Sequence, residues 1–155
     1  MRTGVRIGVD VGKARVGLAR SDRDGLLATP VETVQRRGND LEPVLARIAE
    51  VAAELEAIEL VVGLPLALSG RDTPSTADAR MVADRLAAGP VPVRLIDERL
   101  TTVSAQAALH ASGRNTRGSR SVIDQVAAVI LLQHALDAER ASGSAPGALV
   151  DPKRK

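Results

Sequence analysis

The chain reads Val5-Arg6-Ile7-Gly8-Val9-Asp10-Val11-Gly12 near its start, an apolar run that one carboxylate, Asp10, interrupts. A short run of this kind predicts a strand that is covered on both faces of a sheet. A carboxylate there is costly to desolvate unless a cation or a hydrogen-bond donor compensates it. Asp10 is therefore a better functional candidate than the exposed acidic residues, although it could instead accept backbone N–H bonds in a tight turn.

The residues after this run predict two antiparallel partners for the first strand. Residues 15–20 alternate polar and apolar side chains, as in a hairpin partner, and follow a turn at residues 12–14. A second turn at residues 22–25 precedes a third strand from Leu26 to Val34. Pro30 lacks a backbone N–H, which favours an edge position for this third strand.

The remaining periodicities predict helices alternating with strands. The expected segments are a helix capped by Asn39 and running to Leu55, a strand at 58–64, a helix at 76–88, a strand at 91–96, and helices at 101–111 and 121–140. The order βββαβαβαα predicts an α/β fold with a mixed five-stranded sheet, three antiparallel strands followed by parallel βα units, flanked by helices.

Ligand sites in such sheets favour the carboxyl ends of the strands. Asp10 lies near the end of the first strand, and Asp97 and Glu98 directly follow the last one. These ends could converge.

Length and composition predict one domain without a membrane segment. We expect a domain over residues 1–140 and a disordered basic tail over 141–155, which is rich in Gly, Ser, Pro and basic residues. No stretch of the chain is apolar over the ~20 residues that a membrane span needs, and no signal core is present. The absence of cysteine excludes disulfides and thiolate chemistry. These features predict a cytoplasmic protein.

The residue types also bear on the partner. The chain has no Phe, Tyr or Trp, which disfavours single-strand binding by base stacking on aromatic rings. The net charge is only +2, but 18 of the 21 basic residues are arginine, whose guanidinium pairs with phosphates. An arginine-rich chain is compatible with a nucleic-acid partner, and codon bias would explain the same composition.

Three acidic residues on separate elements suit a metal site. Asp10, Glu98 and Asp124 would supply hard oxygen ligands for Mg²⁺ if the fold brings them together. Local alternatives exist: Glu98 could pair with Arg99 or cap the next helix. Asp124 follows Ser121 by three residues, which matches a capping box. Spacing alone does not separate these readings.

A resemblance to a known family rests on four motifs. Gly8-Val9-Asp10-Val11-Gly12 with Arg15-Val16-Gly17-Leu18-Ala19 resembles the opening of the YqgF/RuvX family of RNase H-like nucleases. The later blocks Val61-Val62-Gly63-Leu64-Pro65, Asp97-Glu98-Arg99-Leu100-Thr101-Thr102 and Asp124-Gln125-Val126-Ala127-Ala128 follow in the family's order. The resemblance covers roughly residues 4–140.

The resemblance implies a fold, a reaction and a set of site residues. It implies an RNase H-like, Mg²⁺- or Mn²⁺-dependent endonuclease that resolves Holliday junctions or matures the 5′ end of 16S ribosomal RNA. Asp10, Glu98 and Asp124 would be the catalytic, metal-binding acids. We expect nucleic-acid phosphates to be contacted by Lys13, Arg15, Arg99, Arg117 and Arg120.

The sequence departs from the family's pattern in two places. Ala14 precedes Arg15 where a lysine is usual, and the lysine is Lys13. Ala67 and Ser69 stand where the family usually has Asn and Asp. These changes concern the substrate-contacting loops more than the acids.

Two other functions compete with the nuclease. One is a nucleic-acid or ribosome-assembly binding module without significant catalysis. The other is an actin-like ATPase, which would need a second domain that 155 residues do not provide. The substrate would be structured RNA, such as pre-16S rRNA, or branched DNA. A symmetric resolvase would favour a homodimer, whereas RNA trimming would not.

Overall fold

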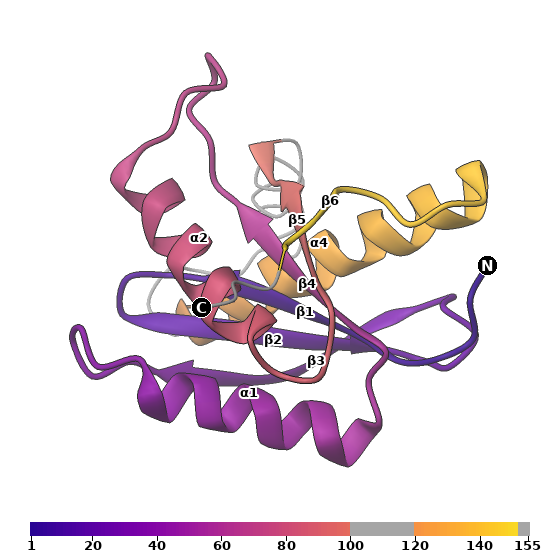
Figure 1. The fold of residues 1–155 in the computed structure, drawn as a ribbon, viewed down its shortest axis with the longest axis horizontal. Helices are drawn as coiled ribbons and strands as arrows, with labels where there is room; N and C mark the ends of the chain where they lie inside the picture. The colour runs from indigo at the N-terminus through magenta and orange to yellow at the C-terminus, as the bar shows by residue number, and fades with distance from the viewer. Residues whose placement is uncertain (100–119, 152–155) are drawn as a thin grey trace.

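A computed structural model describes residues 1–99 and 120–151, and it contains one sheet in the order β3-β2-β1-β4-β5-β6 (Figure 1). In chain order the elements are β1 (Arg6–Val11), β2 (Arg15–Ser21), β3 (Ala28–Gln35), α1 (Glu42–Leu55), β4 (Glu59–Leu64), α2 (Pro74–Ala87), β5 (Val93–Asp97), α4 (Arg120–Ser142) and β6 (Ala148–Leu149). The predicted helix at 101–111 lies outside the described residues.

The pairing confirms a mixed α/β sheet. β1 runs antiparallel to β2 and parallel to β4, while β2–β3 is antiparallel and β4–β5 is parallel. β3 is an edge strand, as Pro30 predicts, and Pro30 lies opposite Ala19 where the β2–β3 register shifts. The described residues form six strands, not the five predicted.

The sixth strand comes from the segment expected to be a disordered tail. α4 continues to Ser142, and β6 pairs antiparallel with β5. The Val150 N–H donates to the Val93 carbonyl at 2.8 Å, and Val150 is buried. The Gly, Ser and Pro content of this segment concealed the short apolar stretch Ala148-Leu149-Val150, which covers the edge of β5. Residues 152–155 lie outside the described part.

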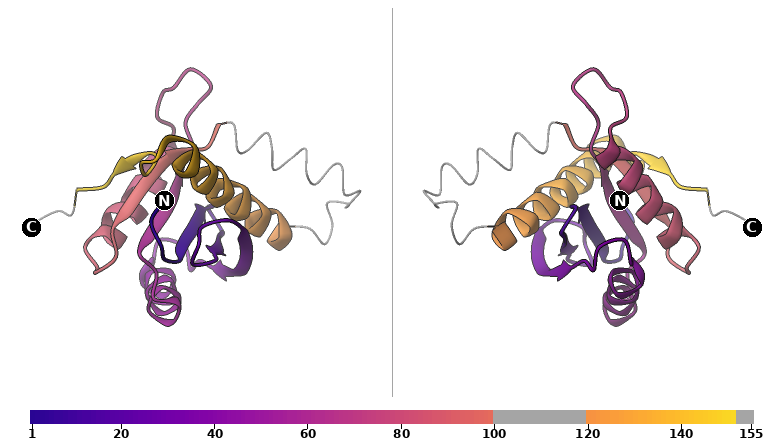
Figure 2. Two further views of the ribbon diagram at one scale, coloured as in Figure 1. Left: turned by 90° about the vertical axis from the view of Figure 1, so that its right-hand side faces the viewer. Right: turned by 90° about the vertical axis from the view of Figure 1, so that its left-hand side faces the viewer.

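Helices cover both faces of the sheet (Figure 2). α1 and α2 pack on one face, where they form a core with Ile7 and Val9 of β1. α4 packs on the other face, where Ala128, Leu131 and Leu132 contact the small residues of the sheet. None of the described helices is long and apolar enough to cross a bilayer.

The start of α1 differs from the prediction. The N-cap is Leu41, without a side-chain cap, instead of Asn39. Asp40 supplies the nearby contact, since its Oδ1 accepts from the Glu42 N–H at 3.1 Å. Two neighbouring residues, Asn39 and Asp40, carry equivalent side-chain oxygens, so composition alone did not distinguish them.

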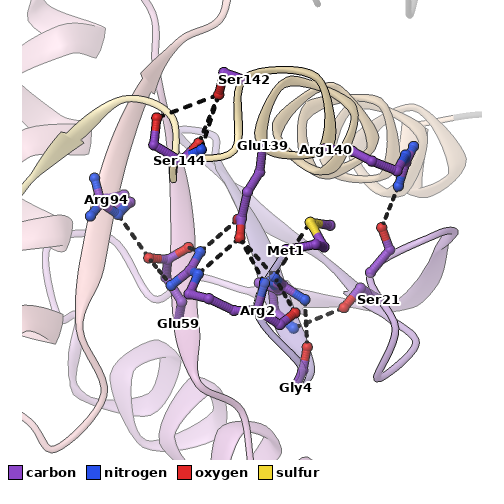
Figure 3. Close-up of polar contacts among 12 residues, drawn as sticks. Met1, Arg2, Gly4, Ser21, Glu59, Arg94, Glu139, Arg140, Ser142 and Ser144 are labelled. Atoms are coloured by element: carbon purple, nitrogen blue, oxygen red, sulfur yellow. Dashed lines mark hydrogen bonds and ion pairs between the residues drawn. The ribbon is translucent and has the colours of Figure 1, made fainter.

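Charged pairs gather at the amino ends of β1 and β4 (Figure 3). Arg2 forms bidentate contacts with Glu139 of α4, at 2.7 and 2.9 Å, and with Glu59 of β4, at 3.0 and 3.2 Å. Arg6, which is 1% exposed, also donates to Glu139, and Arg94 donates to Glu59. This cluster fastens the N-terminus and α4 to the sheet, and its bonds with Arg2 lower the pKa of Glu139 to about 2.

Replacing Glu139 tests this cluster. Because Glu139→Gln leaves buried Arg6 without its carboxylate, we expect the free energy of unfolding to fall by about 3 kcal/mol. The folded-state pKa of Glu139, about 2, lies below the ordinary 4.5, so this stabilisation is present above pH 4.5 and is lost as the pH falls towards 2. Urea unfolding between pH 7 and pH 2 measures both effects.

The matched control is Asp137→Asn on the same helix, where an exposed pair with Arg140 is removed. We expect a loss below about 1 kcal/mol for the control. Equal losses for the two variants would contradict a special role for Glu139.

Candidate active site at the carboxyl ends of three strands

Asp10 lies near the end of β1, opposite Gly17 of β2, and is half-buried. Side chains alternate along a strand, so Asp10 shares a face with Gly8. A Cβ on Gly8 would lie 2.9 Å from both the Ala128 carbonyl oxygen and the Leu132 Cβ of α4. Gly8 therefore lets α4 lie close to β1, and Asp10 is on the α4 face of the sheet.

Glu98 comes to the same edge from β5. Its backbone N–H donates to the Leu64 carbonyl at the end of β4, at 3.2 Å. A Cβ on Gly63 would lie only 2.0 Å from Glu98 Oε2, so the carboxyl group occupies the space above Gly63 that a side chain would fill. Gly63 of the Val61-Val62-Gly63-Leu64-Pro65 motif thus leaves the space that the side chain of Glu98, from the next motif, occupies.

The structure brings the side chains of Asp10 and Glu98 into contact. Burial first, and then the charge of Asp10 and a hydrogen bond with it, raise the pKa of Glu98 to about 8, with a further contribution from Asp97. The raised pKa favours the protonated form of Glu98 in the metal-free protein. Two carboxyl groups held together in a partly buried site are a donor set that suits a divalent cation, which would compete with the proton on Glu98.

Asp124 lies on the first turns of α4, but its side chain lies outside the described residues. The next residue, Gln125, donates from Nε2 to Thr33 Oγ1 at 3.0 Å. Thr33 pairs with Gly17, which pairs with Asp10, so the three residues form one cross-strand row. The first turns of α4, which carry Asp124, therefore lie over the cross-strand row of Asp10, Gly17 and Thr33.

Two further observations bear on the third acid. α4 is already helical at Arg120, so Ser121 lies within the helix rather than at the N-cap that a capping box would need. Among the side chains that the structure describes, no group of three His, Asp or Glu residues could hold a metal. The three-acid site thus remains a prediction with respect to Asp124.

The basic candidates occupy different settings. Lys13 is exposed in the β1–β2 turn, and Arg15 begins β2 and is half-buried. Arg99 donates from Nε to Asp97 at 2.9 Å, which lowers the pKa of Asp97. Arg117 lies outside the described residues, as does the side chain of Arg120.

Arg36 at the end of β3 is a residue that sequence reasoning missed. Its NH1 donates to the Gly12 carbonyl at 2.7 Å and to Asp78 of α2 at 2.6 Å. Its backbone N–H donates to the Ala14 carbonyl at 2.9 Å. Arg36 thereby holds the turn that carries Lys13. No local pattern reveals this role, because its partners come from other parts of the chain.

The fold is that of the RuvC-like, RNase H-like nucleases. It is similar to the solved structure of T. thermophilus RuvC in complex with a Holliday junction substrate, with a TM-score of 0.55 and 19% identity. The similarity covers 95% of this chain and 99% of that chain. The predicted fold class is therefore confirmed.

Sequence comparison identifies the family. The family model described as RuvX, Holliday junction resolvase, matches residues 4–138, and the chain belongs to the RuvX family. A protein of Clavibacter sepedonicus named "Putative pre-16S rRNA nuclease" is 66% identical over 155 residues, covering 99% of this chain and 96% of the relative. A Nocardioides protein of the same name is 57% identical, covering 97% and 99%.

The contact between Asp10 and Glu98 makes a prediction about stability. The pKa of Glu98 is raised from 4.5 to about 8, so ionising Glu98 costs the folded metal-free protein more than the unfolded chain. We expect Glu98→Gln to be more stable than the native chain in EDTA, with a difference that grows from pH 4.5 to pH 8. Urea unfolding across this range measures it.

The control is Glu54→Gln, which changes an exposed glutamate of α1. We expect its stability to follow that of the native protein over the same pH range. A Glu98→Gln curve that also runs parallel to the native one would contradict the buried contact with Asp10.

Proposed function

We propose that this protein is a divalent-metal-dependent endonuclease that hydrolyses phosphodiesters in structured nucleic acid. The observation that carries the proposal is the contact between Asp10 and Glu98 at the carboxyl ends of β1 and β5, the two strands that lie on either side of β4. A partly buried pair of carboxyl groups in contact lowers the stability of the metal-free fold, which supports a functional reason for its presence. Membership of the RuvX family supports the same reaction class.

Asp10, Glu98 and Asp124 would hold Mg²⁺ or Mn²⁺. When bound, such ions activate water for attack on phosphorus and neutralise the leaving oxygen. Asp10 contacts Glu98 and shares a cross-strand row with Thr33, which accepts a hydrogen bond from Gln125, the neighbour of Asp124 in the chain. These contacts support Asp10 as the residue that would bridge two ions.

The basic residues divide between contacting phosphates and bracing the site. Lys13 in the β1–β2 turn and Arg15 at the start of β2 follow Asp10 closely in the chain and would contact the backbone of the nucleic acid, as would Arg117 and Arg120. Arg99 donates hydrogen bonds to Asp97 and to the Leu68 carbonyl. We therefore propose that its main role is to hold these two segments together, and that contact with a phosphate is secondary.

The names of the relatives support a particular substrate. Because relatives at 66% and 57% identity are named for pre-16S rRNA, we propose the 5′ end of that precursor as the first substrate. Such a substrate implies a cytoplasmic location. The family description favours branched DNA as the second candidate, and symmetric cleavage of a junction would need a homodimer. Assays of both substrates side by side, with the mass of the protein in solution, separate these candidates.

Asp10→Asn tests the reaction. The substitution keeps the shape of the side chain but removes the bridging charge, so we expect the cleavage rate to fall by at least about a hundredfold. The measurement compares purified native and variant protein on an rRNA precursor and a four-way DNA junction with Mg²⁺, Mn²⁺ or EDTA.

Equal cleavage by the two proteins would overturn the proposal, because a contaminant would then explain the activity. Binding of either substrate without metal-dependent cleavage would favour the alternative, a nucleic-acid or ribosome-assembly binding module.

Gly63→Ala tests how Glu98 is seated. A methyl group at this position would overlap Glu98 Oε2, so we expect it to displace the carboxyl group and to lower cleavage by more than tenfold, a barrier increase of about 1.4 kcal/mol or more. Cleavage rate is measured together with the fraction of folded protein. The control is Gly89→Ala, where the nearest atom, the Leu86 carbonyl oxygen, lies 3.3 Å from the added Cβ. Loss of activity in proportion to loss of folded protein would contradict the seating role.

A further inference from the structure

The segment between β4 and α2, residues 65–73, stands out from the sheet on the side of the candidate active site (Figures 1 and 2). Leu68 lies in this segment and is 89% exposed. The other exposed large apolar side chains of the described residues are between 47% and 61% exposed. A leucine presented so fully to water has no packing role in the isolated protein.

Hydrogen bonds fix the backbone that presents Leu68. The Gly70 N–H donates to the Ala67 carbonyl at 2.7 Å, and the Ala67 N–H donates to the Arg71 carbonyl at 2.9 Å. Gly70 has a φ of +90°, which a side chain would strain. Residues 67–71 therefore form a closed turn with Leu68 near its tip.

The same turn is fastened to the candidate active site. Arg99 NH1 donates to the Leu68 carbonyl at 3.1 Å, while Arg99 Nε donates to Asp97 at 2.9 Å. Glu98, the acid in contact with Asp10, lies between these two residues in the chain. At the base of the segment, Thr76 Oγ1 donates to the Pro65 carbonyl. The position of Leu68 is thus set by the residues that flank the catalytic acid.

We propose that Leu68 is a wedge that inserts between neighbouring bases of the bound nucleic acid, beside the phosphodiester that the metal site of Asp10 and Glu98 would cleave. Apolar side chains on rigid supports separate base steps and bend the helix in this way. The chain has no aromatic residue that could stack on a base, so a wedge in this protein would be an aliphatic side chain. Arg71, exposed in the same turn, provides a positive charge for the adjoining phosphates. The proposal rests on the proposed nuclease function and identifies a residue that selects deformable substrates.

Base unstacking can be measured without cleavage. We would place 2-aminopurine at successive positions in an rRNA-precursor stem and in a four-way DNA junction, and follow its fluorescence on titration with protein in Ca²⁺. Intact strands are verified on denaturing gels. The native chain should raise the fluorescence at one position on at least one substrate, and Leu68→Ala should lose most of that increase while still binding. Leu68→Phe, which restores a large apolar side chain, should recover it.

The matched control is Leu27→Ala. Leu27 is also an exposed leucine, but it lies in the β2–β3 connection, away from Asp10 and Glu98. We expect this variant to behave like the native chain. An unchanged fluorescence increase with Leu68→Ala, or no increase with the native chain when it binds, would overturn the wedge and leave the nuclease proposal standing. Failure of the native chain to bind either substrate would overturn both proposals.

Discussion

Two carboxyl groups, those of Asp10 and Glu98, share one partly buried place at the edge of the sheet, and the surrounding fold is arranged to put them there. Parallel pairing of β1, β4 and β5 brings the carboxyl ends of these strands to the same edge. Gly63 leaves room for the Glu98 side chain, and Gly8 lets α4 approach β1. Burial first, and then the contact with Asp10, raise the pKa of Glu98 to about 8, so ionising Glu98 is unfavourable in the metal-free protein.

The other end of the same sheet, at the amino ends of β1 and β4, carries favourable charge pairs. Glu139 of α4 and Glu59 of β4 meet Arg2 at the amino ends of β1 and β4, where the contact lowers the pKa of Glu139 to about 2. α4 therefore joins a strongly paired end of the sheet to an end where two acidic side chains meet. This arrangement suits an enzyme, because a stable anchor offsets the destabilisation of a site built for a cation.

Local patterns predicted most of the elements, and the errors have identifiable causes. The apolar alternation of β1 and β2 and the helical period of α1 are properties of short segments, so they are visible in sequence. The β6 strand was missed because a strand of two residues, in a segment rich in Gly, Ser and Pro, shows no periodicity. This strand forms only by pairing with the edge of β5. The cap of α1 was misplaced because Asn39 and Asp40 offer equivalent oxygens.

The sequence by itself determined the fold class and the family motifs. It also led to the prediction that Asp10 is functional, since a carboxylate within an apolar run is conspicuous whatever its surroundings. Only the tertiary structure decided that Glu98 is its partner, that Arg36 braces the turn after it and that Leu68 stands exposed in a turn bonded to Arg99. These relations join residues distant in the chain. They depend on strand pairing and on the space left by glycines, which no local pattern contains.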